Sequence, residues 1–204
     1  MKGLVELAPG LHRWTARHPD ADPNPDPGSS ADWGPDVGCV AYEAPDALVL
    51  VDPLVPDDRP DLLGALDALV RSHGRRVAIL TTLGFHRRSK EELAARYDAS
   101  TSRARKTLPE GVETIQIKGA GETMVWLSEP RALVPGDRLI GADGGGLRLC
   151  ADSWLGYLPS GMRAPELREA LRPLLDLPVE TVLVSHGEPV LRKGRDAIAR
   201  ALER

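Results

Sequence analysis

The chain has 204 residues, of which 42% are hydrophobic, so it can bury one sizeable core or two smaller cores that share an interface. The net charge of −4 is mild, and it argues against a nucleic-acid-binding domain, which carries a basic patch or stripe. No segment approaches the roughly 20 apolar residues that cross a bilayer, and Glu6 interrupts the apolar run that a signal peptide would need. We therefore expect one cytoplasmic domain over residues 1–204, with no nucleic-acid or membrane partner.

The first part of the chain predicts strands before helices. Strands are expected over residues 11–16, 37–43, 47–52 and 76–81, and helices over residues 60–72 and 89–97. The strands at 37–43 and 47–52 form a hairpin, and Ser89-Lys90-Glu91-Glu92 reads as a capping box that starts the second helix. Residues 18–36 are rich in Pro, Asp, Gly and Ser and predict a long loop. Cys39 and Cys150 lie in apolar surroundings and predict two buried thiols that are not joined by a disulfide.

The second part alternates in the same way. Strands are expected over residues 112–118, 123–127, 131–134 and 179–184, a flexible loop over 141–146, and helices over 165–175 and 194–202. Strands and helices mixed in this order favour a sandwich of sheets with helices outside, which is an α/β (α+β) fold.

Three polar residues follow three apolar, strand-like runs. His86 comes after the run at 77–80, Asp137 after the run at 132–134, and His186 after the run at 182–184. Ligand sites form where strands end at their carboxyl edge. Two imidazoles and one carboxylate are a typical set of protein ligands for a catalytic zinc, and they leave a coordination position for water. The sequence therefore predicts a hydrolytic metal site.

The order of these segments resembles the metallo-β-lactamase fold. The resemblance is carried by the hairpin from Gly38 to Pro53, by Pro135-Gly136-Asp137, by Ser185-His186-Gly187 and by the strand–loop–helix unit at 78–97. It covers nearly the whole chain and implies a four-layer αββα sandwich. Asp52, at the end of its strand, resembles a residue that steadies the loop near the metal; a strand-end cap is the alternative.

The resemblance also shows what the chain lacks. The family's metal motif is His-x-His-x-Asp-His, and with His86 at its last histidine the other positions hold Thr81, Leu83 and Phe85. The Gly-His-Thr turn of the family corresponds to 119–123, where Ala120 replaces the histidine. The first metal site of the family is thus missing, and the second lacks its aspartate. The remaining set could hold one zinc, with iron or manganese as alternatives, or no metal at all.

Four further residues are predicted to bind a substrate. Arg87 and Arg88 beside His86 would attract phosphate or carboxylate if their loop faces the cleft; otherwise they are a solvated pair. Trp154 and Tyr157 would line the cleft or pack as partly buried rings. Two functions follow. One is a single-metal hydrolase of an ester, thioester, amide or phosphoester. The other is a metal-free binding or regulatory module for an anionic small molecule.

Overall fold

The computed structural model of the chain describes residues 3–102, 104–142 and 144–203. The hairpin predicted at 37–52 forms the middle of a five-stranded sheet. The strands, in their order across the sheet, are β1 (Val5–Ala8), β2 (Leu11–Arg17), β3 (Asp36–Ala44), β4 (Ala47–Val51) and β5 (Arg76–Leu80). Strand β4 is antiparallel to β3 and parallel to β5, and helix α1 (Pro60–His73) makes the crossover between β4 and β5. All residues of β4 are buried, as expected for an apolar strand that is covered on both faces.

A second sheet is built from the later strands. Its order is β11 (Thr181–Val182), β8 (Ala132–Val134), β7 (Glu122–Leu127) and β6 (Val112–Ile117). Strand β11 is parallel to β8, whereas the pairs β8–β7 and β7–β6 are antiparallel. Each sheet thus contains one parallel pair, β4–β5 and β11–β8.

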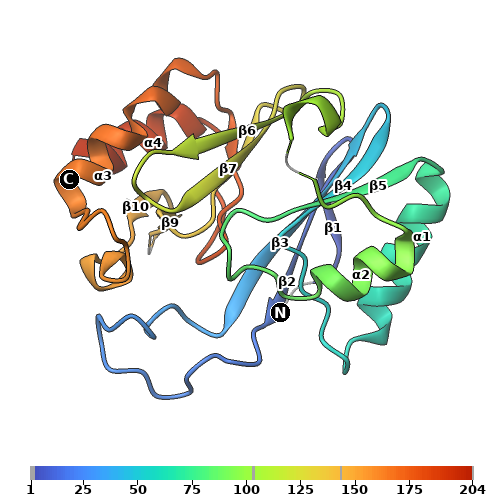
Figure 1. Cartoon of the computed structure of the whole chain (residues 1–204), viewed down its shortest axis with the longest axis horizontal. Coiled ribbons are helices and arrows are strands. Elements are labelled where there is room, and N and C mark those ends of the chain that lie inside the picture. The colour runs from blue at the N-terminus through green and yellow to red at the C-terminus, as the bar shows by residue number, and fades with distance from the viewer. Residues whose placement is uncertain (1–2, 103, 143, 204) are drawn as a thin grey trace.

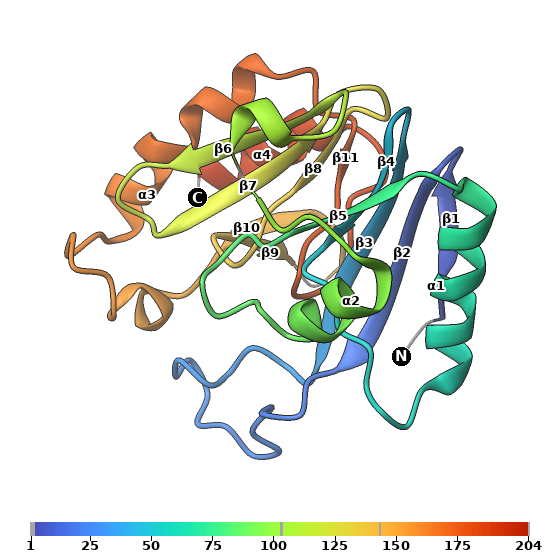
Figure 2. The same cartoon turned by 45° about the vertical axis from the view of Figure 1, so that its right-hand side comes forward.

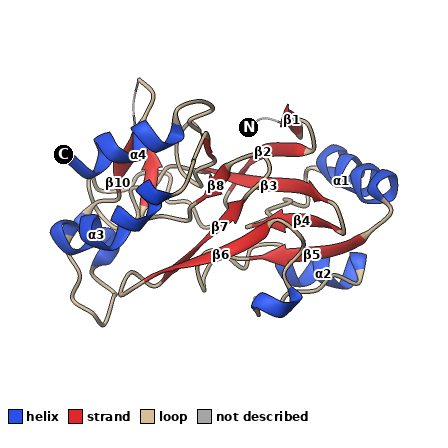
Figure 3. Cartoon of the chain, turned by 90° about the horizontal axis from the view of Figure 1, so that it is seen from above, coloured by secondary structure: helices blue, strands red, loops and turns tan. Residues whose placement is uncertain are grey.

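The helices lie outside the two sheets, which gives the four-layer sandwich that the sequence predicted (Figures 1 and 3). Helices α1 and α2 (Lys90–Tyr97) pack on the first sheet, and α3 (Ala164–Leu171) and α4 (Gly194–Glu203) pack on the side of the second. A third apolar cluster, with Val49, Val125 and Leu183, fills the space between the sheets. Among the described helices, none has the length and apolar character needed to span a membrane.

Several predicted boundaries need correction. The capping box at Ser89 is wrong, because its hydroxyl bonds to the backbone of Val55 rather than to helix α2. The helix predicted at 165–175 ends at Leu171 and continues as a 3-10 helix, η3 (Arg172–Asp176), because Pro173 cannot donate the next helical hydrogen bond. The strand predicted at 179–184 shrinks to β11, because residues beyond it turn toward β3, where Gly38 N donates to Ser185 O.

Three short strands were not predicted. One is β1, and the other two are β9 (Leu139–Gly141) and β10 (Leu147–Leu149), which pair as a hairpin. The loop predicted at 141–146 connects β9 to β10; its residue 143 lies outside the described residues. Runs of three or four residues carry too little alternation to identify a strand. Cys39 and Cys150 are buried and are not joined to each other, as predicted.

The segment between Arg17 and Asp36 contains no helix or strand, and Figure 2 shows it leaving the ends of β2 and β3 as one long excursion. Its base is closed by a hydrogen bond from His18 N to Pro35 O at 2.8 Å. Its middle is attached to the segment that follows β10, where Ser153 Oγ donates a hydrogen bond to Gly28 O at 2.8 Å. The loop therefore bridges the mouth between the two halves of the sandwich.

Candidate metal centre

Three side chains from distant segments converge at the carboxyl ends of the parallel strand pairs. His86 follows β5, Asp137 follows β8 and His186 follows β11. All three are buried, and one ligand atom from each lies within 4.8 Å of the other two. Within residues 3–102, 104–142 and 144–203, no other group of His, Cys, Asp and Glu meets this description. The residues predicted as ligands therefore do share a common focus.

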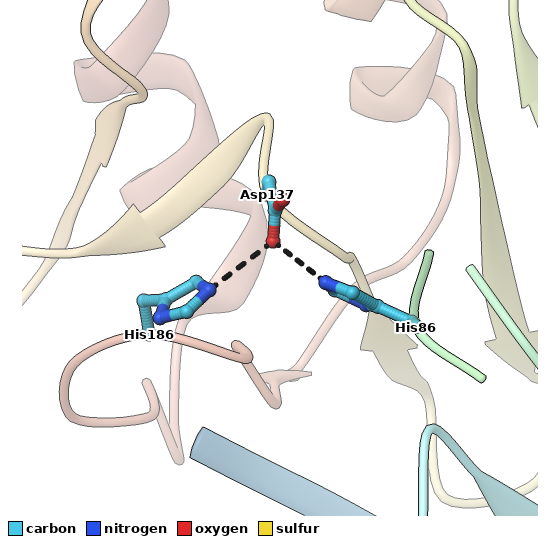
Figure 4. Close-up of side chains that lie close together, drawn as sticks. All are labelled: His86, Asp137 and His186. Atoms are coloured by element: carbon cyan, nitrogen blue, oxygen red, sulfur yellow. Dashed lines mark ion pairs between the residues drawn. The ribbon is translucent and has the colours of Figure 1, made fainter. Parts of the chain in front are cut away.

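Asp137 lies between the two imidazoles (Figure 4). Its Oδ1 atom is 3.2 Å from Nε2 of His86 and 3.3 Å from Nε2 of His186. The same oxygen is buried and has no hydrogen-bond partner in the part of the chain that the structure describes. A buried carboxylate oxygen in this condition is costly, so it calls for a proton or a cation.

The far nitrogen of each imidazole is already occupied. Nδ1 of His86 lies 2.9 Å from Oδ2 of Asp52, and Nδ1 of His186 lies 3.0 Å from the carbonyl oxygen of Trp33. Both partners can only accept, so each Nδ1 donates and each Nε2 is turned into the centre. When the rings are neutral, their Nε2 atoms carry lone pairs that face the Asp137 carboxylate. This is how proteins orient histidines that bind metals.

The charges in the centre are strongly coupled. Although burial lowers the pKa of His86, the charges of Asp52 and Asp137 raise it to about 9. Burial likewise raises the pKa of Asp137, but the charge of His86 and the contacts with both imidazoles hold it far below its usual range. In the absence of another cation, the raised pKa favours an imidazolium at His86, which offsets part of the charge of the two carboxylates.

Asp52 holds more than His86. Its Oδ1 accepts from the backbone N–H of Thr82 at 2.9 Å, and its Oδ2 accepts from the Thr82 hydroxyl at 2.5 Å. Burial opposes ionisation of Asp52, yet the charge of His86 lowers its pKa. Asp52 thereby fixes the start of the loop that carries His86, which is the position the sequence resemblance implied for it.

Glu122 holds the backbone of the loop that carries Asp137. This residue was not identified from the sequence. Its carboxylate accepts from the backbone N–H groups of Gly136, Asp137 and Arg138 at 3.0, 2.8 and 2.9 Å. Burial, together with the charge of Asp137, raises the pKa of Glu122 to about 7. The available signal was an acidic residue at the head of the otherwise apolar strand β7.

Gly136 is required by the same packing. A Cβ atom at this position would lie 2.5 Å from Thr82 Oγ1, and a carboxylate oxygen of Glu122 would be 3.1 Å away. Only glycine lets the loop before Asp137 approach the loop before His86 this closely. The Pro-Gly-Asp sequence is thus needed for the approach of the two segments as well as for the turn.

The positions at which the resemblance would place further metal ligands hold no histidine and no carboxylate. Leu83 and Ala120 are buried among apolar atoms, Thr81 has only a hydroxyl, and Phe85 is 57% exposed. A leucine, an alanine and a phenylalanine offer no metal-binding atom. The centre consequently contains one candidate set of ligands.

The two arginines next to His86 differ. The Arg87 side chain is 71% exposed, lies 3.7 Å from Glu91 and does not line the pocket beside the centre, in contrast to its predicted position. Arg88 lines that pocket, but its Nη1 donates to Gly38 O and Asp52 O and its Nη2 donates to Ser185 Oγ. Arg88 thus ties the hairpin to the His186 loop through its two terminal nitrogens, whereas its buried Nε has no hydrogen-bond partner among the described residues.

The pocket beside the centre has a volume of about 380 Å3 and is rich in aromatic side chains. The rings of Trp33 and Trp154 lie edge-on to His186, with centroid distances of 5.5 and 5.4 Å. Tyr157 lies at the mouth and is 55% exposed. Trp154 and Tyr157 are thus in the cleft where the sequence predicted them.

The sequence did not identify His18 and Trp33, which the long loop brings into the pocket. The rings of His18 and Trp33 pack edge-to-face, with a centroid distance of 5.2 Å. Burial, with the charge of Arg88, lowers the pKa of His18. Nothing in a Pro- and Asp-rich stretch signals which of its residues will face a site.

Several solved structures share this arrangement of elements. A metallo-β-lactamase from Erythrobacter litoralis is 17% identical, with a TM-score of 0.61, and the match covers 98% of this chain and 90% of that chain. The mono-zinc form of the NDM- and FIM-1-like enzyme from the same organism is 16% identical, with a TM-score of 0.60 and coverages of 98% and 94%. The flavodiiron protein from Giardia intestinalis is 14% identical, with a TM-score of 0.63, and all of this chain matches 58% of that one.

No family model matches this sequence, and no curated protein is similar to it in sequence. The likeness at these identities concerns the architecture. The chain therefore has the metallo-β-lactamase fold, as its ordered motifs indicated.

Proposed function

We propose that the protein is a hydrolase that works with a single divalent metal ion, held by His86, Asp137 and His186. The observation that carries the proposal is the convergence of two Nε2 atoms on the buried Oδ1 of Asp137, which has no hydrogen-bond partner among the described residues. Three acceptor atoms that meet in a buried space fit a cation better than they fit one another. Two imidazoles and one carboxylate suit zinc, with iron or manganese as alternatives.

The chemistry of such an ion is the generation of hydroxide from bound water near neutral pH, together with polarisation of a carbonyl or phosphoryl oxygen. The residues of the chain serve this chemistry by orientation. Asp52 and the Trp33 carbonyl hold the two imidazoles with Nε2 inward, and Glu122 holds the Asp137 loop. The rings of Trp33 and Trp154 form an apolar wall of the pocket next to His186. The substrate is an ester, thioester, amide or phosphoester.

A second candidate is a metal-free binding module. It is favoured by the raised pKa of His86, because an imidazolium between Asp52 and Asp137 forms an ion pair with each carboxylate without a metal ion. The anionic ligand predicted for such a module has weaker support. Arg87 lies outside the pocket, and Arg88 donates to three oxygens of the protein.

The experiment that separates the candidates is elemental analysis of protein purified after growth with added zinc, iron or manganese. The hydrolase predicts about one ion per chain, lost in Asp137→Asn and His186→Ala and retained in the exposed control Asp176→Asn. The loaded protein should then cleave 4-nitrophenyl acetate or bis(4-nitrophenyl) phosphate, with activity removed by a chelator and restored by the metal. Near-zero occupancy under all three conditions would overturn the proposal and leave the binding module.

A further inference from the structure

Two aromatic side chains stand exposed at the mouth of the pocket. Phe85 is 57% and Tyr157 is 55% exposed, and their ring centroids lie 5.9 Å apart at an interplanar angle of 79°. Of the other large apolar side chains that are exposed in the described chain, Val5 and Leu191, neither lines this pocket. Exposed apolar side chains that lie together at one opening indicate a binding surface, whereas single exposed ones need no explanation.

Both rings are held in place by polar groups behind them. Phe85 lies edge-to-face on the ring of His86 at 5.2 Å, and His86 is itself fixed by Asp52. The hydroxyl of Tyr157 accepts a hydrogen bond from the guanidinium of Arg138. Each ring is therefore presented to the opening in a defined orientation, which reduces the entropy lost when a ligand binds.

Arg138 makes the orientation of Tyr157 firm. This arginine is fully buried, and its Nε donates to the carbonyl oxygen of Ala120 at 2.9 Å. The polar end of Tyr157 is thus turned into the protein while its ring faces the opening. A tyrosine that bound an anion through its hydroxyl would have the opposite arrangement.

The interior of the pocket continues the aromatic surface. The rings of Trp33 and Trp154 form its inner wall next to His186. The volume of about 380 Å3 is within the usual range for small-molecule sites, which are mostly apolar. Asp20 and Asp137 place negative charge in the lining beside the single positive charge of Arg88, whose terminal nitrogens already donate to oxygens of the protein, so the lining favours an uncharged group over an anionic one.

We propose that Phe85 and Tyr157, whose rings contact each other edge-to-face, form an aromatic corner whose free faces bind a planar, uncharged aromatic group of the ligand. The inference rests on the proposed function only in treating this ligand as a substrate, whose scissile bond would lie toward Asp137. Recognition itself needs no metal. The substrates that fit are neutral esters, thioesters or amides with an aryl or similarly flat substituent, rather than phosphoesters.

The test uses chelator-treated protein titrated with 2-naphthylmethanol, with cyclohexylmethanol as the non-planar probe and 2-naphthoate as the anionic one. Aromatic contacts account for roughly a two- to tenfold change in affinity for each ring. We expect the neutral aryl probe to bind most tightly. Phe85→Ala and Tyr157→Ala should each weaken it by about that factor, and Tyr157→Phe should keep most of the affinity.

Arg87→Ala is the matched control, because this side chain is next to the site in sequence but exposed and outside the pocket. Circular dichroism confirms that each variant is folded. The aromatic corner is overturned if the aryl probe binds Phe85→Ala and Tyr157→Ala as tightly as it binds the unaltered protein, if it does not bind the unaltered protein at all, or if the anionic probe is preferred. Because metal is absent throughout, a protein that never binds an ion can still pass this test, and a metal-loaded hydrolase can fail it.

Discussion

The imidazole of His86 bridges two buried carboxylates: its Nδ1 lies 2.9 Å from Asp52 Oδ2, and its Nε2 lies 3.2 Å from Asp137 Oδ1. Asp52 comes from the end of β4 and Asp137 from the loop after β8, so this single ring joins the two sheets. This bridge orients the His86 ring, the proposed metal ligand, and it also determines the charge of the centre. Changes to either carboxylate should therefore alter both metal affinity and stability.

Replacement of Asp52 by asparagine should weaken metal binding by about 10- to 100-fold, the usual effect of losing the partner of a metal-binding histidine. The physical reason is that an uncharged amide at this position would leave the Nδ1 proton of His86 without a charged acceptor. Competition against a chelator of known affinity measures the change. Asp61→Asn, at an exposed position of helix α1, is the control, and equal affinities in the two variants would contradict this role of Asp52.

The stability of the metal-free protein should depend on pH through His86. Its pKa in the folded protein, about 9, lies above the ordinary value of 6.5, so the folded state binds this proton more tightly. The resulting stabilisation, on the order of 1–3 kcal/mol, is fully present below pH 6.5 and is lost as the pH rises toward about 9. Chemical denaturation across this range measures it, and His86→Gln should flatten the profile. A wild-type stability that is constant from pH 6.5 to 9 would speak against the bridge.

Metal binding should show the opposite pH dependence. The ion needs neutral imidazoles, so binding must displace the proton that His86 carries in the metal-free state. Affinity should therefore increase as the pH rises from 6.5 to 8, with about one proton released per ion. Calorimetry in buffers of different ionisation enthalpy counts the protons, and binding without proton release would contradict the protonated state of His86.

Glu122→Gln should destabilise the protein by about 1–3 kcal/mol. The amide keeps the volume but presents an NH2 group, or a weaker acceptor, to three backbone N–H donors. Because those donors belong to the Asp137 loop, metal affinity should fall as well. Glu113→Gln, exposed on strand β6, is the control. If urea denaturation gives the same stability for both variants, Glu122 is not a support of the site.

Phe85→Asp should separate the two proposals. The new carboxylate would add a fourth side-chain ligand, and the exposed position of Phe85 makes the change tolerable for the fold. We expect metal affinity to rise by at least tenfold while binding of 2-naphthylmethanol weakens. Phe85→Asn, which lacks the charge, should weaken the aryl probe alone. A fall in metal affinity in Phe85→Asp would show that this side chain does not face the ion.

The sequence was sufficient for the parts of the site that follow strand ends. His86, Asp137 and His186 were found because a polar residue after an apolar run is an unusual pattern, and the structure brings the three together. Leu62 and Leu66 of helix α1 are both buried, as their helical spacing predicted. Local pattern and resemblance therefore carried the architecture and the candidate ligands.

The remaining features depend on contacts between distant segments. Arg87 and Arg88 look alike in sequence, and only the positive φ of 43° at Arg88 and its bonds to Gly38 and Ser185 distinguish them. Trp33 enters the pocket because its loop is anchored near Ser153. Ser89 has the right neighbours for a helix cap, but its hydroxyl is used by Val55. A single sequence contains no signal for partners of this kind.

The central claim is that one cation belongs between two imidazoles and one carboxylate. Anomalous diffraction from crystals soaked in zinc, with data collected on both sides of the zinc absorption edge, tests this most directly. We predict one strong peak within bonding distance of His86 Nε2, Asp137 Oδ1 and His186 Nε2, and its absence from crystals of Asp137→Asn. Wild-type crystals with no peak at that point, or with zinc only at surface residues, would contradict it.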